Sequence, residues 1–170
     1  WRYSIKNTYE VSKILDVAKN NNADVEFLFL TLTIKNVDLK ALKATLKVVH
    51  EGFRRLMQYK RVAGVVQGYI RSTEITINQQ TSQAHPHVHA VLVVPKGYAR
   101  RKQLKRYINI DEWQALWRKA LKADYDPIVN IQKIKARKRK GKKAEKSELA
   151  AAKETAKYQV KSSDYITGDR

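Results

Sequence analysis

Three of the four histidines in this 170-residue chain lie within five positions, at His85, His87 and His89. The apolar run 90–94 follows them directly, which indicates a β-strand. Side chains two apart on a strand point to the same face, so His87 and His89 project together while Val88 faces the opposite way. Two neutral imidazoles so placed can share a divalent cation, which can polarise the oxygens of a bound phosphate. The alternative is a pair of surface histidines on a half-exposed strand.

Glu74 is the candidate third ligand, because it lies on the preceding predicted strand. If that strand pairs antiparallel with the histidine strand, Glu74 can face the same side as His87 and His89. One carboxylate and two imidazoles, with positions left open, suit Mg²⁺ or Mn²⁺. Otherwise Glu74 is an ordinary solvent-facing residue. His85 is a candidate auxiliary ligand, and Pro86, which cannot donate to a β-ladder, is expected near the strand start or on an edge.

A second group of reactive side chains lies on the last predicted helix, which begins at Ser147. At about 100° per residue, Glu154, Tyr158 and Lys161 lie within roughly 60° of one another on one helix face. A phenolate can attack a phosphodiester in line, an ammonium can stabilise the phosphate charge, and a carboxylate can accept a proton. The alternative is a solvated helix face with a half-buried Tyr158. Tyr165 is the lesser nucleophile candidate, because the helix is expected to fray before it.

Hydrophobic patterning predicts the elements that position these residues. Helices are expected over residues 8–21, from a cap at Asp38 to about residue 56, from a cap at Asp111 to residue 121, and from residue 147 to 158. Strands are expected over residues 25–35, 64–77 and 128–134, and through the histidine run. Several strands follow one another without a helical crossover, which favours an α+β fold with a central antiparallel sheet and flanking helices. Trp113 and Trp117 have helical spacing and are expected in the core rather than as base-stacking platforms.

Composition indicates the class of partner. Lysine plus arginine number 35 and aspartate plus glutamate 16, giving a net charge of +19 that attracts polyanions, nucleic acid first. No cysteine occurs, which excludes disulfides and thiolate metal sites. No secretory signal and no apolar segment long enough to span a membrane is found, so a cytoplasmic location without membrane contact is expected.

The chain is expected to form one domain, residues 1–170, cut from a longer protein. The basic run 135–146 is predicted to be a mobile loop. Two interpretations of this loop stay open: it grips a DNA hairpin through phosphates, or it is a solvated run with generic affinity for polyanions.

Three motifs in order carry a family resemblance: residues 29–33 with Asn36, the histidine run 85–89, and residues 157–161 followed by Asp164 and Tyr165. Together they resemble the catalytic domain of rolling-circle replication initiators (Rep) of the HUH endonuclease superfamily. The resemblance extends over most of the chain and is closest to the plasmid Rep subgroup with a single catalytic tyrosine.

The resemblance implies an HUH/Rep-type fold with a ferredoxin-like core, and a tyrosine helix lying across a metal held by His87, His89 and Glu74. It implies a metal-dependent, site-specific single-strand DNA endonuclease and strand transferase with Tyr158 as nucleophile. A 5′-phosphotyrosine link then forms, the freed 3′-hydroxyl primes synthesis, and the circle is resealed. Glu154 matches the glutamate that promotes the terminating water attack, and Lys161 the lysine three residues after the tyrosine.

The implied partners are single-stranded or hairpin origin DNA and host replication proteins. Two alternative functions stay open. An HUH transposase or conjugative relaxase would use the same site on a different DNA. A non-catalytic nucleic-acid-binding module would explain the charge but not the face formed by Glu154, Tyr158 and Lys161.

Overall fold

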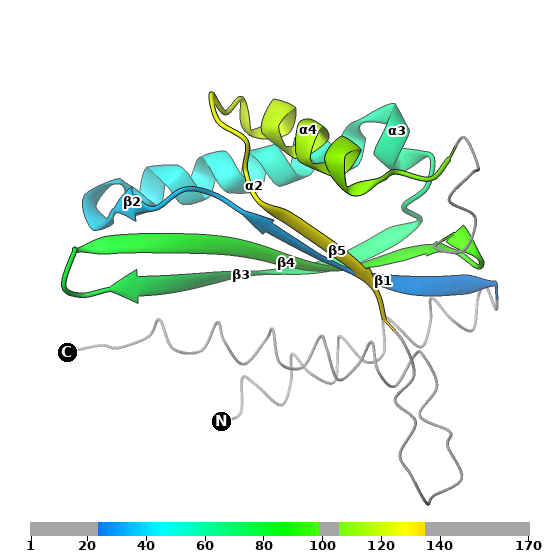
Figure 1. Cartoon of the computed structure of the whole chain (residues 1–170), viewed down its shortest axis with the longest axis horizontal. Coiled ribbons are helices and arrows are strands. Elements are labelled where there is room, and N and C mark those ends of the chain that lie inside the picture. Colours follow the sequence, from blue (N-terminus) through cyan, green and yellow to red (C-terminus); the bar gives the residue numbers. More distant parts are fainter. Residues whose placement is uncertain (1–23, 99–105, 135–170) are drawn as a thin grey trace, which may run out of the picture.

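The computed structural model describes residues 24–98 and 106–134, which form one antiparallel sheet with helices packed on one of its faces (Figure 1). The strands are β1 (Val25–Thr33), β2 (Val37–Asp38), β3 (Gly68–Asn78), β4 (Gln83–Pro95) and β5 (Val129–Lys133). The helices are the 3₁₀ turn η1 (Leu39–Ala41), α2 (Leu42–Gln58), α3 (Lys60–Ala63) and α4 (Ile110–Leu121). The predicted α+β class is therefore confirmed. The helices expected over residues 8–21 and 147–158 and the basic run 135–146 lie outside the described residues.

β4 is the strand around which the sheet is built. It pairs antiparallel with β3 along one edge and with β1 along the other, and β5 pairs with the far side of β1. The short β2 pairs with β4 at Ala84 and Gln83, just beyond the end of β1. Pro86 lies in the gap between β1 and β2, near the start of β4, where its missing N–H breaks no ladder bond to either strand. The expectation for Pro86 is confirmed.

The helical layer covers one face of the sheet, with α2 and α4 packed side by side (Figure 1). Trp113 and Trp117 are buried in this layer, as predicted, and Trp117 Nε1 donates to the Thr33 carbonyl at 3.2 Å. Gly52 lies where the two helices meet, since a Cβ there would stand 3.2 Å from Leu121 Cδ2. Among the described helices, none has the length and apolar character needed to cross a membrane.

The structure corrects three of the predicted boundaries. The N-cap of α4 is Asn109, whose side chain accepts from Glu112 N at 2.8 Å, and Asp111 instead lies in the first turn. Asp38 caps the η1 turn, and the long helix begins only at Leu42. Gly64 does not open a strand: it ends α3, and β3 starts at Gly68.

Candidate functional site

The alternation of β4 places its histidines on the face of the sheet opposite the helices. Val88 is 1% exposed and belongs to the core beneath the helices, so His87 and His89, one residue to either side, point to the other face. The register sets Glu74 of β3 opposite His87, and Thr31 of β1 opposite His89. The predicted sharing of one face by Glu74, His87 and His89 is confirmed.

Glu74 contacts the farther of the two histidines. Its Oε2 lies 2.8 Å from His89 Nε2, a diagonal contact between the neighbouring strands. The His89 side chain is 16% exposed and that of Glu74 39%, so the pair lies half-sheltered at the surface of the sheet. Glu74 is thus a partner of the histidine cluster rather than an isolated solvent-facing residue.

The His89 ring is also held from the other side. Thr31 Oγ1 lies 3.1 Å from His89 Nδ1, and the Phe29 ring lies parallel to the imidazole at 5.7 Å between centroids. Both residues belong to the first of the three motifs, but the sequence pattern did not predict that either of them contacts His89. The contacts depend on the register of β1 against β4, and periodicity within one strand does not reveal that register.

His85 and His87 form the end of the cluster nearer the start of β4. Their ring centroids are 4.3 Å apart, and those of His87 and His89 are 6.1 Å apart. Burial lowers the pKa of His87 below its ordinary value of 6.5, and positive charge on His85 or His89 would lower it further, whereas Glu74 raises it. His87 is therefore neutral at pH 7, the form in which an imidazole binds a metal.

The donor chemistry of this cluster fits a divalent metal, although its present geometry is not a closed metal site. Across residues 24–98 and 106–134, no three His, Asp or Glu side chains converge as metal ligands do. Instead, Glu74 and His89 satisfy each other with a hydrogen bond, which they would exchange for a shared cation.

Ser72, directly opposite His89, supplies a second sign of an incomplete site. Its Oγ is buried and has no hydrogen-bond partner among residues 24–98 and 106–134. An unpaired buried hydroxyl is costly, and a polar ligand bound beside His89 would satisfy it. No sequence pattern singles out Ser72, because its importance comes from its burial in the folded sheet.

The predicted second group of reactive residues is not placed by the structure. Tyr158, Glu154, Lys161 and the lesser candidate Tyr165 all lie outside the described residues. Their assignment remains a prediction from the motif and its spacing.

Comparison with known proteins finds replication proteins, in agreement with the motifs. A family model described as "Replication protein" matches residues 1–170. The chain is 44% identical to a Protein rep of Lactiplantibacillus plantarum over 99% of this chain and 52% of that protein. It is 37% identical to a Protein rep of Bacillus amyloliquefaciens, over 100% and 51% respectively. It is 38% identical to a Replication protein of Staphylococcus aureus, over 97% of this chain and 68% of that protein.

The chain spans about half the length of the first two of these relatives. No solved structure matches it significantly. The match of the family model over the whole chain, with a relative covered over two thirds of its length, confirms the resemblance carried by the motifs. The chain belongs to the Replication protein family.

Proposed function

We propose that this chain is the nicking and joining domain of a plasmid rolling-circle replication initiator, acting on single-stranded or hairpin origin DNA. The observation that carries the proposal is the cluster on the sheet face opposite the described helices, in which Glu74 and Thr31 contact opposite sides of the His89 ring beside a neutral His87. Membership of the Replication protein family supports it. The setting we propose is the cytoplasm, where host replication proteins would extend the freed 3′ end.

His87, His89 and Glu74 are the residues that would hold a divalent cation, Mn²⁺ or Mg²⁺. Such a cation supplies Lewis-acid polarisation of the scissile phosphate. The chain's own residues prepare the site: Thr31 fixes the orientation of the His89 ring, and burial keeps His87 unprotonated. His85 flanks His87 as an auxiliary group.

Tyr158 is the proposed nucleophile, by the resemblance of its motif. Its phenolic oxygen attacks the phosphorus, a bond forms between them, and the bond from phosphorus to the 3′ oxygen breaks. The DNA is left with a free 3′-hydroxyl and a 5′ phosphate on the tyrosine. Lys161 would stabilise the charge on the phosphate, and Glu154 would accept the proton from the attacking phenol or water. Attack by a 3′-hydroxyl on the phosphotyrosine reverses these bond changes and joins the ends.

Metal titration tests the first half of the proposal. Isothermal titration of the full chain with Mn²⁺ is expected to show one site, lost or weakened at least about 10-fold in His89→Ala and in Glu74→Gln. His50→Ala is the matched control, because His50 makes a similar contact, with Thr73 Oγ1 at 3.1 Å, on the helix side of the sheet. Equal binding by wild type and His89→Ala would overturn the assigned metal centre.

A covalent adduct assay tests the second half. The protein is incubated with Mn²⁺ and a pool of labelled single-stranded oligonucleotides that includes the plasmid's own origin region, and run on a denaturing gel. A slow-migrating adduct is expected, absent with EDTA and in Tyr158→Phe but retained in Tyr165→Phe. An adduct that survives in Tyr158→Phe moves the nucleophile to Tyr165. Salt-sensitive binding without any adduct would favour the non-catalytic binding module, and an adduct only with a transposon end or transfer origin would favour the transposase or relaxase.

A further inference from the structure

A hollow between α2 and β3 lies on the helix side of the sheet, away from the histidines. It has a volume of about 340 Å³ and is lined by His50, Glu51, Phe53, Arg54, Tyr69 and Arg71. We call it the α2–β3 hollow. Within the described residues β3 pairs only with β4, so its other edge is open. The volume falls in the range of small-ligand sites.

Aromatic rings and a guanidinium form the floor and wall of this hollow. The buried Phe53 ring meets Tyr69 edge-on, with centroids 5.2 Å apart and planes at 72°, and Arg71 lies over Phe53 at 5.3 Å from its centroid. Tyr69 nevertheless remains 45% exposed. An ordered aromatic ring with so much free surface, beside a stacked arginine, is the arrangement that proteins use to hold an unpaired base.

The hollow carries positive charge that can bind a phosphate. Glu51 pairs with Arg55 at 3.7 Å, whereas Arg54 and Arg71 form no ion pair with a carboxylate in the part of the chain that the structure describes. Burial, and then the charge of Arg71, lowers the pKa of His50, so His50 is neutral at pH 7. Two arginines without acidic partners therefore face the hollow, and such guanidinium groups bind phosphates readily.

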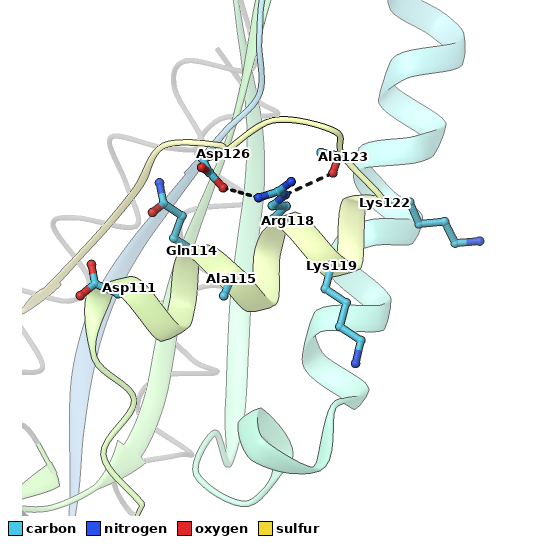
Figure 2. A pocket seen from close by; sticks show the side chains of 8 residues that line it. All are labelled: Asp111, Gln114, Ala115, Arg118, Lys119, Lys122, Ala123 and Asp126. Atoms are coloured by element: carbon cyan, nitrogen blue, oxygen red, sulfur yellow. Dashed lines mark hydrogen bonds and ion pairs between the residues drawn. The ribbon is translucent and has the colours of Figure 1, made fainter.

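A second surface hollow, of similar volume, shows what is particular to the first. The α4 hollow, drawn in Figure 2, lies on the outer side of α4 and is also about 340 Å³ in volume. No aromatic residue lines it, and its Arg118 already donates to Asp126 at 2.9 Å and to the Ala123 carbonyl. Size and nearby lysines alone therefore do not make a base-binding site.

We infer that the α2–β3 hollow binds an unpaired nucleotide of single-stranded DNA, with the base stacked on Tyr69 and the neighbouring phosphates bound by Arg54 and Arg71. The inference rests on the proposed function for its substrate class and extends it to the helix side of the sheet. Tyr69 lies five residues from Glu74 on β3, roughly 17 Å at about 3.4 Å per residue. Among the described residues, no strand pairs with the outer edge of β3, so a DNA strand leaving the histidine cluster would reach the hollow by passing around this edge.

Fluorescence anisotropy with two labelled probes tests the inference. One probe is a thymine oligonucleotide of about 20 nucleotides and the other an abasic oligonucleotide of the same length. The test variant is Tyr69→Leu, which keeps an apolar contact on Phe53 but removes the stacking surface. It is expected to bind the thymine probe about 5- to 150-fold more weakly and the abasic probe as wild type does. Tyr69→Phe is expected to retain both affinities.

The arginines give an independent readout. Arg71→Ala and Arg54→Ala are each expected to weaken both probes and to lower the salt slope of binding by about one. Lys119→Ala, which removes a charge from the α4 hollow, is the matched control and is expected to leave the preference for the thymine probe over the abasic probe unchanged. Circular dichroism melting of each variant identifies any loss of folding.

The two proposals fail in distinguishable ways. If Tyr69→Leu and Arg71→Ala fold and bind both probes as wild type does, the α2–β3 hollow is not a nucleotide site, even where the covalent adduct forms. If the adduct never forms but Tyr69→Leu still loses base-dependent binding, the nucleotide site in the hollow is supported and the proposed nicking reaction is overturned. If an acidic peptide but not the thymine probe depends on Tyr69, the inferred ligand class is wrong.

Discussion

The hydroxyl of Thr31 is predicted to control metal binding without touching the metal. Thr31 Oγ1 lies 3.1 Å from His89 Nδ1, while His89 Nε2 faces Glu74 at 2.8 Å. A neutral His89 that donates its Nε2–H to Glu74 has a bare Nδ1, to which the hydroxyl can donate. A His89 that binds a cation through Nε2 carries its proton on Nδ1, and the same hydroxyl can then accept. Threonine thus suits both tautomers, and valine, of similar shape, suits neither.

The expected size of the effect follows from this single hydrogen bond. His89 is 16% exposed, so the bond is partly sheltered from water and its loss should cost about 0.5–1.5 kcal/mol of folding stability. Loss of an outer partner of a metal-binding histidine typically weakens metal affinity about 10- to 100-fold. We therefore expect Thr31→Val to reduce Mn²⁺ affinity by that factor in isothermal titration while the protein stays folded.

Two variants make this prediction specific. Thr31→Ser keeps the hydroxyl and is expected to restore most of the affinity. Thr73→Val removes another threonine hydroxyl that contacts a histidine, also at 3.1 Å but on the helix side, and is expected to leave Mn²⁺ binding unchanged. Equal Mn²⁺ affinity in wild type and Thr31→Val would refute the argument that this hydroxyl orients the imidazole.

Two further predictions concern the support of the sheet. Arg61 holds the pKa of Glu112 below its ordinary 4.5, chiefly by hydrogen bonding. The ionised Glu112 therefore stabilises the fold above pH 4.5, and this contribution is lost as the pH falls through the lowered pKa. Thermal melts of Glu112→Gln from about pH 6 to pH 3 should thus show a lower midpoint at pH 6 and a flatter pH dependence, and parallel curves would contradict this. Trp117→Phe removes the hydrogen bond to the Thr33 carbonyl and leaves a buried void, so the free energy of unfolding measured in urea should fall by about 2–4 kcal/mol. A fall of less than about 0.5 kcal/mol would contradict this prediction.

The fold was predictable where one periodicity extended over many residues. The alternation of β4 and the long apolar face of α2 were both readable, and so was the burial of Trp117. α3 was missed because four residues are too short to show a helical period. Asn109 was missed as a cap although a readable signal was present: a glutamate, Glu112, stands three residues after it, as in a capping box.

The candidate site was predictable only as far as it depends on one strand at a time. Side-chain parity placed His87 and His89 together, and antiparallel pairing allowed Glu74 to share their face, which the Glu74–His87 register then realises. The contacts of Thr31 and the place of the buried Ser72 hydroxyl beside His89 depend on which residues stand opposite His89, and that register is a property of the assembled sheet. Tyr158 and Glu154 lie outside the described residues, so their roles stay predictions.

The register of the β3–β4 hairpin joins the two sites that we propose. β3 sends Glu74 to the histidine face and Tyr69 to the helix face, and a slip of one residue would exchange the two faces. The turn that fixes this register is held by Asn78, whose Oδ1 accepts from Gln80 N at 3.0 Å and Thr81 N at 3.2 Å. A polar turn remote from both sites is therefore part of what sets the metal ligands and the nucleotide hollow in place together, because the side chains of one strand cannot be re-registered independently.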